Sequence, residues 1–286
     1  MARCSVCFHH CNILEGKKGL CGARTCVNGK VVSENYGRIT AFALDPVEKK
    51  PLRRFFPGSM ILSVGSYGCN LRCPFCQNHE ISWSTEAMRM SGEVEKITPE
   101  ELVYAAKRAK SRGNIGLAFT YNEPLVGWEF VRDAASMAHE AGLINVMVTN
   151  GTAEPEILEA LLPYIDAMNV DLKGFTEHYY TGVLGGDLGT VKAFITRAVK
   201  ECHVELTTLI VPGENDSVEE MRALTEWVAG LKDTKGNTIG RSIPLHVSRF
   251  FPRFCMTDRP ATDIGKVYRL ADAARERLDY VYTGNC

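Results

Sequence analysis

One stretch of this 286-residue chain decides how the rest is read, and it runs Gly65-Ser66-Tyr67-Gly68-Cys69-Asn70-Leu71-Arg72-Cys73-Pro74-Phe75-Cys76-Gln77-Asn78. Its three cysteines follow the spacing C-x3-C-x2-C, and an aromatic residue stands directly before the last one. Thiolates in such a loop can bind three irons of a cubane [4Fe–4S] cluster and leave the fourth iron without a protein ligand. We therefore predict an iron–sulfur cluster on Cys69, Cys73 and Cys76, with one corner open to a small ligand.

Two other interpretations of these cysteines remain open at this point. They could form part of a zinc site, with His79 as the fourth ligand, or they could be buried structural thiols. An aromatic residue before the last cysteine and a preceding strand are not typical of zinc ribbons, whose cysteines come in closely spaced pairs. The pattern therefore favours the iron–sulfur cluster.

The residues after this loop predict an alternation of strands and helices. Short apolar runs predict strands at 60–64, 116–119, 145–148, 167–170, 204–211 and 243–247, with a seventh at 280–282. Two helix starts carry capping-box sequences, Thr98-Pro99-Glu100-Glu101 and Ser217-Val218-Glu219-Glu220. Six successive β–α steps predict a parallel sheet with helical crossovers. Periodicity alone does not decide whether this sheet is open or curled into a partial barrel.

The first part of the chain differs from the rest, and we predict two domains: a Cys-rich module at 1–57 and the main domain at 58–286. The module is too poor in apolar residues to form a core alone. Four of its cysteines have the spacing of a small metal-binding module, namely Cys4, Cys7, Cys11 and Cys21. Zinc and an auxiliary iron–sulfur cluster both fit this spacing, and reduced cysteines without metal are the third alternative. Cys26 is interpreted as a spare thiol, and His9 and His10 are alternative ligands.

Composition limits the classes of protein to consider. The formal net charge is −1, which provides no global basic field for nucleic acid or for a membrane surface. The N-terminus lacks the apolar segment of a signal peptide, and the chain has no apolar run of membrane-spanning length. We therefore expect a cytoplasmic protein. In that compartment the 11 bunched cysteines indicate metal or cluster ligation rather than disulfides.

These residues resemble a known family, because C-x3-C-x-aromatic-C is the signature of radical S-adenosylmethionine (SAM) enzymes. From about residue 60 to residue 255 the chain is similar to glycyl-radical-enzyme activating enzymes, typified by pyruvate formate-lyase activating enzyme. It also resembles their relatives in the AmmeMemoRadiSam system, which begin with a similar Cys-rich segment. The resemblance implies a partial (β/α)6 barrel of the TIM type, with the cluster and SAM at its carboxyl-end mouth. Those relatives often carry a cysteine-bearing C-terminal tail, whereas this sequence stops at Cys286, so a tail is absent or missing from the sequence.

The resemblance also implies a set of cofactor-binding residues. In the segment 120–124, Asn122 and Glu123 stand in a loop that meets the methionyl amino group of SAM in activating enzymes, although Tyr121 and Asn122 replace two glycines there. Thr149 is expected near the SAM carboxylate. The remaining expectations are an Asp-Leu-Lys element for the amino-acid part of SAM, a histidine near the adenosyl ribose and neighbours from the motifs quoted above, namely Asp171, Lys173, His246, Tyr67, Phe75 and Asn150.

Each of these residues also has an ordinary structural interpretation. Asp171 and Lys173 could form a solvated ion pair, His246 could be a core histidine, and Glu123 could close a turn. Their common position favours the binding role, because all of them fall at or near the carboxyl ends of predicted parallel strands.

The activity that the resemblance implies is the reductive cleavage of SAM to a 5′-deoxyadenosyl radical, which abstracts a hydrogen atom from a substrate. The enzyme would be an oxidoreductase that works anaerobically with a one-electron donor such as flavodoxin or ferredoxin, and no side chain need act as a catalytic acid or base. The substrate is either a protein that receives a glycyl radical or another protein, peptide or small molecule modified in the AmmeMemoRadiSam context. A hypothesis of a different class is a zinc-binding adaptor without catalysis. A nucleic-acid target is disfavoured by the near-zero net charge.

Overall fold

The computed structural model of the chain describes residues 1–83, 89 and 94–286. An eight-stranded sheet forms its centre, in the order β12-β11-β10-β9-β8-β7-β6-β5. Its strands are β5 (Ala41–Pro46), β6 (Met60–Gly65), β7 (Asn114–Phe119), β8 (Ile144–Thr149), β9 (Ala167–Asp171), β10 (His203–Ile210), β11 (Leu245–Arg249) and β12 (Val281–Gly284). The strands from β6 to β12 are parallel, and only β5 pairs antiparallel, with β6. All seven predicted strands are therefore confirmed, and β5 is an eighth.

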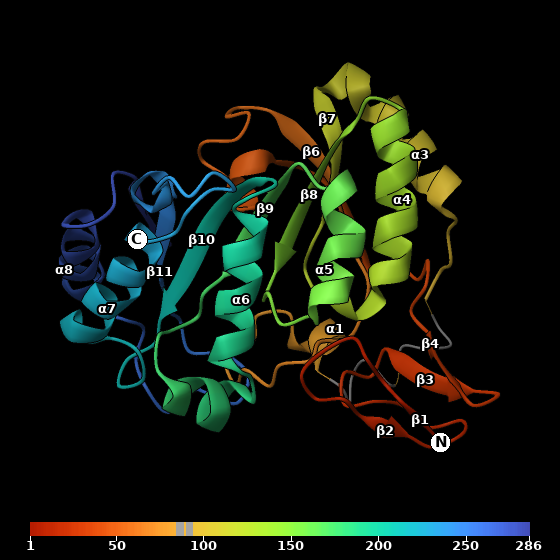
Figure 1. Cartoon of the computed structure of the whole chain (residues 1–286), viewed down its shortest axis with the longest axis horizontal. Coiled ribbons are helices and arrows are strands. Elements are labelled where there is room, and N and C mark those ends of the chain that lie inside the picture. Colours follow the sequence, from red (N-terminus) through yellow and green to blue (C-terminus); the bar gives the residue numbers. More distant parts are fainter. Residues whose placement is uncertain (84–88, 90–93) are drawn as a thin grey trace.

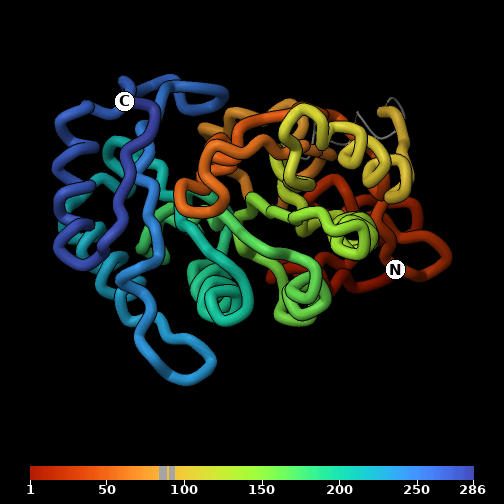
Figure 2. Tube along the Cα trace, turned by 90° about the horizontal axis from the view of Figure 1, so that it is seen from above, coloured from red at the N-terminus to blue at the C-terminus, as the bar shows by residue number. Residues whose placement is uncertain are grey.

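The helices are α1 (His79–Ser82), α3 (Pro99–Arg108), α4 (Trp128–Glu140), α5 (Pro155–Leu161), α6 (Leu188–Ala198), α7 (Val218–Ala229) and α8 (Ile264–Arg275). Helices from α3 to α8 cover one side of this sheet, and the short α1 directly follows the cysteine loop at the carboxyl end of the strands (Figure 1). Seen from above, they follow the outer side of a curved sheet from α3 round to α8 (Figure 2). Because β5 and β12 end the strand order at opposite edges, the barrel is partial, as predicted.

Local signals place the starts of these helices. The Thr98 hydroxyl accepts from the Glu101 amide at 3.2 Å, and the Glu101 carboxylate accepts from the Thr98 amide at 2.8 Å, which confirms the first capping box. At α7 only half of the predicted box exists. Ser217 accepts from the amide of Glu220, but the Glu220 carboxylate accepts from the Phe175 amide at 2.6 Å instead of returning to Ser217. The predicted second capping box is wrong because a loop on the neighbouring βα unit offers this carboxylate a closer donor.

The amino ends of the strands are closed by the segment between β5 and β6. The backbone amides of Arg53 and Arg54 donate to the carboxylate of Glu205 on β10 at 3.0 and 2.8 Å. The side-chain amide of Asn169 on β9 donates to the carbonyl of Pro51 at 2.9 Å. This segment thus forms a floor to the barrel, at the opposite end from the loop that carries Cys69.

The N-terminal segment packs against loops at the carboxyl ends of β6 and β8, at the lower edge of the molecule in Figure 1. It contains two short hairpins, formed by β1 (Ala2–Arg3) with β2 (Asn12–Ile13) and by β3 (Arg24–Val27) with β4 (Lys30–Ser33). Residues 41–46, which lie within the predicted module, belong to the large sheet as β5. The division into domains at residue 57 stays a prediction.

The contact between this segment and the Cys69 loop is close. Gly68 has φ +93°, and a Cβ placed there would lie 2.7 Å from both the Cys21 carbonyl oxygen and the Ala23 Cβ. The next amide, that of Cys69, donates to the Cys21 carbonyl at 3.3 Å. Only glycine fits this position, because it combines a left-handed backbone with a backbone-to-backbone approach.

None of the described helices is both long enough and apolar enough to span a bilayer.

Candidate active site

A cavity of about 280 Å³ opens at the carboxyl ends of the parallel strands. It is lined by Cys69, Leu71, Cys73, Phe75, Cys76, Gln77, Asn78, Ser82, Tyr121, Asn122, Glu123, Asn150, Asp171, Lys173, Thr207, Leu209, Ser248 and Asn285. These residues come from the loops and ends of six parallel strands, from β6 to β11, and from the end of β12. Loops at this end of a (β/α) barrel carry the chemistry in known enzymes of this architecture.

The three cysteines of the sequence motif all face this cavity as free thiols. The backbone amide of Leu71 donates to the Cys69 sulfur at 3.4 Å, and the Asn150 side-chain amide lies 3.7 Å from the same sulfur. Burial raises the pKa of the Cys73 thiol to about 11, while the nearby Lys173 ammonium lowers it. Donors and a cation around buried sulfurs stabilise thiolates, which are the form that binds iron.

The donor set fits a polynuclear cluster. Among the residues with described positions, no three His, Cys, Asp or Glu side chains approach one another closely enough to hold a single metal ion. A cubane cluster does not need that convergence, because each thiolate binds a different iron. Cys69, Cys73 and Cys76 would hold three corners, and the rest of the cavity lies beside them.

An ion pair at the carboxyl end of β9 lines the cavity. The Lys173 ammonium lies 2.7 Å from a carboxylate oxygen of Asp171, and the lysine side chain is largely buried. Burial lowers the pKa of Lys173, but the negative charge of Asp171 and that of a Cys73 thiolate outweigh it and hold the pKa well above its usual value. This wall therefore presents a fixed positive and a fixed negative charge to any ligand in the cavity.

Glu123 is a buried carboxylate at the centre of the site. It accepts from the Thr149 hydroxyl at 2.6 Å, from the Asn150 amide at 2.8 Å and from the Leu125 amide at 3.1 Å. Burial raises its pKa to about 7 against the effect of these donors, with a further increase from the charge of Asp171. The carboxylate thus links the end of β7 to the end of β8, and its charge changes near neutral pH.

The two residues that replace glycines in this loop have definite structural roles. Tyr121 has φ +73°, the left-handed conformation that glycine adopts without strain, and its hydroxyl donates to Asp45 at 2.7 Å. The Asn122 side chain accepts from the Ser66 amide at 2.9 Å and donates to the Gly68 carbonyl at 3.1 Å. The loop after β7 therefore keeps the glycine-type backbone, and Asn122 ties it to the cysteine loop.

The structure brings most of the predicted cofactor-binding residues to this cavity together with Cys69, Cys73 and Cys76, and three of the cofactor-binding residues lie elsewhere. Tyr67 is fully buried against Cys21 and its neighbours rather than facing the cavity. Thr149 lies behind Glu123, to which it is hydrogen-bonded. His246 lies in the barrel interior, where its Nε2 is 2.7 Å from Glu205. Their expected contacts with SAM stay predictions.

Sequence reasoning did not single out several residues of the cavity wall. Thr207 and Leu209 alternate along β10, and Ser248 lies near the end of β11. Asn285 reaches the cavity from beyond β12 and donates to the Ser248 hydroxyl at 3.0 Å. A period-two pattern on a predicted strand could have indicated Thr207 and Leu209, but nothing local in the sequence marks Asn285.

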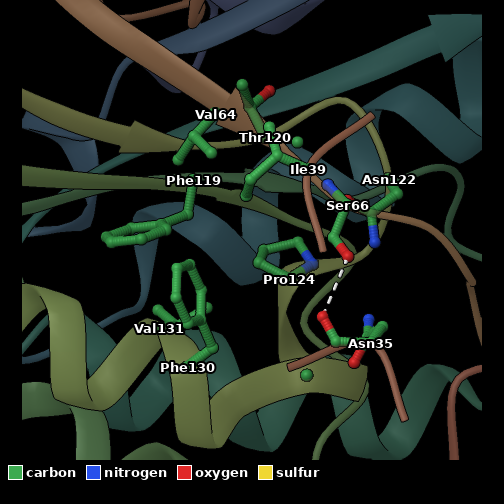
Figure 3. A pocket seen from close by; sticks show the side chains of 12 residues that line it. Asn35, Ile39, Val64, Ser66, Phe119, Thr120, Asn122, Pro124, Phe130 and Val131 are labelled. Atoms are coloured by element: carbon green, nitrogen blue, oxygen red, sulfur yellow. Dashed lines mark hydrogen bonds between the residues drawn. The ribbon is translucent and has the colours of Figure 1, made fainter. Parts of the chain in front are cut away.

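A second, smaller cavity lies beside the loops that carry the site (Figure 3). Its lining includes Ser66, Asn122 and the rings of Phe119 and Phe130, without any thiol or charged group. The Ser66 hydroxyl donates to the Asn35 carbonyl at 3.4 Å across it. Its volume is about 30 Å³, about a tenth of that of the cavity at the cysteine loop.

Comparison with known proteins agrees with this geometry. The family model for the radical SAM superfamily matches residues 63–225, which is more than half of the chain. The chain therefore belongs to the radical SAM superfamily, and it is an enzyme of that class, with a [4Fe–4S] cluster and SAM as its cofactors. The alternative of a zinc-binding adaptor without catalysis is thereby rejected.

Particular relatives extend this assignment. An uncharacterized protein of Methanocaldococcus jannaschii is 39% identical over 285 residues, covering 99% of this chain and 81% of the relative. The pyruvate formate-lyase-activating enzyme of Clostridium pasteurianum is 28% identical and covers 59% of this chain and 69% of its own length. Among solved structures, Streptococcus suis SuiB bound to S-adenosylmethionine matches with a TM-score of 0.57 at 14% identity, over 77% of this chain and 48% of SuiB. That likeness confirms the fold.

Proposed function

We propose that this enzyme abstracts a hydrogen atom from a substrate in the manner of a glycyl-radical-enzyme activating enzyme, with a protein or peptide segment as that substrate. When bound, the cluster supplies the electron that cleaves SAM and so generates the radical of this superfamily. The observation that supports the proposal is one cavity that gathers three free thiols, the Asp171–Lys173 pair and Glu123.

In this proposal the chain's own residues bind and orient. Cys69, Cys73 and Cys76 hold the cluster, and Lys173 and Asp171 hold the carboxylate and the amino group of SAM by charge-assisted hydrogen bonds. Glu123 accepts from the amino group while Thr149 and Asn150 fix its orientation. Leu71 and Phe75 provide buried apolar wall beside the cysteines, which limits the access of water to a reactive radical.

Relatives support the choice of substrate class. Besides the Clostridium pasteurianum enzyme, the benzylsuccinate synthase activating enzyme of Thauera aromatica is 27% identical over 65% of this chain and 56% of its own length. A second candidate is radical modification of another peptide or a small molecule. It is favoured by the loop after β7, where Tyr121 and Asn122 replace the two glycines of activating enzymes. A flavodoxin or ferredoxin is the proposed electron donor.

The test is anaerobic reconstitution with iron and sulfide, followed by dithionite and SAM. The proposal expects release of 5′-deoxyadenosine, abolished in Cys73→Ala and retained in Cys202→Ala, whose thiol lies outside the cavity. Deuterated candidate substrates then identify the attacked position by transfer of label into 5′-deoxyadenosine. A wild-type sample with a verified cluster that releases no 5′-deoxyadenosine would contradict the proposal.

A further inference from the structure

The N-terminal cysteines gather around a cavity of their own, which the proposed activity does not use. Cys4, Cys7, Cys11 and Cys21 all line it; the first three lie in the loop between β1 and β2, and Cys21 lies in the loop between β2 and β3. Three of the four are buried, and Cys11 is half-buried. Cys26, in the same segment, does not line the cavity, and its thiol donates to Glu15 at 3.4 Å instead. The four cysteines are thus set apart from the fifth by position.

The surroundings of these sulfurs resemble those of Cys69 in the first cysteine loop. The amide two residues ahead donates to the sulfur at Cys7 and at Cys21, as it does at Cys69, where Leu71 is the donor at 3.4 Å. The Asn70 side chain also donates to Cys7. Amides directed at sulfur stabilise thiolates and the clusters they hold.

Arg24 is a buried cation at the same cavity, and its hydrogen bonds within the described residues leave one nitrogen unpaired. Arg24 is 5% exposed and lines the cavity, and one of its terminal nitrogens lies 2.6 Å from Glu129. Its Nε is buried without a hydrogen-bond partner among the described residues. A buried unpaired N–H is costly, so it indicates an acceptor that belongs in this cavity. A cluster bound by four thiolates carries net negative charge and sulfur acceptors, and it would satisfy this requirement.

The geometry distinguishes between a cluster and a single zinc ion. Zinc needs its sulfurs drawn tightly around one point, at about 2.3 Å from the metal. No three potential ligands are drawn together in that way anywhere in residues 1–83, 89 and 94–286. The described positions of Cys69, Cys73 and Cys76, which belong to the signature of a cluster-binding family, likewise form no single-ion site. Separate corners of a cubane fit both groups.

We propose that Cys4, Cys7, Cys11 and Cys21 hold a second [4Fe–4S] cluster, fully coordinated by protein and adjacent to the first. Four thiolates occupy all four irons, so this cluster has no corner for SAM, in contrast to the cluster on Cys69, Cys73 and Cys76. The two sites are joined directly, because the Cys69 amide donates to the Cys21 carbonyl at 3.3 Å. Through Asn70 and Asn150, side-chain hydrogen bonds also connect Cys7 to Cys69.

The test counts metals in the full-length, anaerobically reconstituted chain. Wild type is expected to hold about eight irons, and the triple variant Cys69→Ala/Cys73→Ala/Cys76→Ala about four. After reduction, the triple variant should give a [4Fe–4S] electron paramagnetic resonance signal that does not shift when SAM is added. This readout does not depend on activity, so it stands or falls separately from the proposed function.

The reciprocal variant is Cys7→Ala/Cys11→Ala, matched by the control Cys26→Ala/Cys202→Ala. The first should fall to about four irons, with a remaining signal that shifts with SAM, and the control should keep about eight. Circular dichroism checks that each variant is folded. If the reciprocal variant does not fold, the iron content of the triple variant decides the test. A triple variant without iron, or with one zinc per chain in place of iron, would overturn the proposal.

Discussion

Gly65, the last residue of β6, lies directly against the side chain of Tyr121. A Cβ at Gly65 would be 2.9 Å from the Tyr121 ring and 3.1 Å from the Thr120 carbonyl oxygen. The Tyr121 ring has little freedom to move away. Its backbone is held at φ +73°, and its hydroxyl donates to Asp45. Glycine at the end of the first parallel strand is therefore required by its neighbour on the next loop.

The first prediction concerns this contact. Gly65→Ala should lower the free energy of unfolding by about 1–3 kcal/mol, because the added methyl group overpacks a site that includes backbone. Urea denaturation of the purified protein measures the loss. The control is Gly230→Ala, where the nearest atom to a new Cβ is at 3.5 Å and the backbone is right-handed. Equal stability of the two variants would contradict the close contact.

A second prediction concerns Glu205, which is fully buried in the barrel interior. Burial raises its pKa, but hydrogen bonds from His203, His246 and the amides of Arg53 and Arg54 outweigh burial and bring the pKa down to about 2. A carboxylate with a lowered pKa stabilises the fold above its ordinary pKa of 4.5, and that stabilisation is lost as the pH falls toward 2. The shift corresponds to about 3 kcal/mol at neutral pH.

Glu205→Gln should remove that contribution and flatten the decline in stability between pH 4.5 and pH 2. Denaturant unfolding at a series of pH values checks both effects. Glu226→Gln is the matched control, since it breaks only an exposed ion pair with Arg277 and should leave the stability close to that of wild type. A wild-type protein whose acid sensitivity equals that of Glu205→Gln would rule out the assigned role.

The third prediction tests the charged wall of the cavity. Lys173→Met should weaken SAM binding by about ten- to a hundredfold, the loss expected for one charge-assisted hydrogen bond. It also leaves Asp171 without its partner at 2.7 Å. Calorimetry on cluster-loaded protein measures the dissociation constant. Lys192→Met, whose ammonium lies over the Phe175 and Trp227 rings outside the cavity, should bind SAM as wild type does.

The fourth prediction uses the titration of Glu123. With a pKa raised to about 7 by burial, this group is mostly neutral at pH 6 and mostly ionised at pH 8. An ionised carboxylate accepts more strongly from an amino group, so SAM affinity should rise as the pH increases through 7. Glu123→Gln keeps the shape but does not ionise, and its SAM affinity should show no such step. A step of equal size in both proteins would assign the titration to another group.

The sequence predicted the parts of the fold that local signals specify. Seven strands and the cap at Thr98 follow from apolar periodicity and short-range polar contacts, both of which are visible in a few neighbouring residues. Strand β5 was not predicted, because this edge strand is defined by its pairing with β6 rather than by a hydrophobic pattern in its own residues. The capping role assigned to Glu220 failed for a similar reason, since its acceptor capacity is taken by Phe175, 45 residues earlier.

The candidate site also combines features that local sequence specifies with features that depend on distant partners. Cysteine spacing indicated Cys69, and the family resemblance indicated Glu123 and Lys173 at the ends of predicted parallel strands; the structure brings all three to one cavity. The partner of His246 could not be predicted, because Glu205 is 41 residues away and meets it only through the pairing of β10 with β11. Register between strands, which no single segment contains, decides such contacts.

The floor formed by the segment between β5 and β6 lies at one end of the barrel, and the cofactor cavity lies at the other. Stability and specificity therefore depend on different residues. Glu205 and the backbone of Arg53 and Arg54 lock the amino ends of the strands, on the far side of the barrel from the cofactor cavity. We expect substitutions there to change thermal stability without changing the loops at the mouth, which contact the substrate. Homologous chains can thus differ in specificity through the loops at the mouth while the stability of the barrel is kept by the residues at the floor.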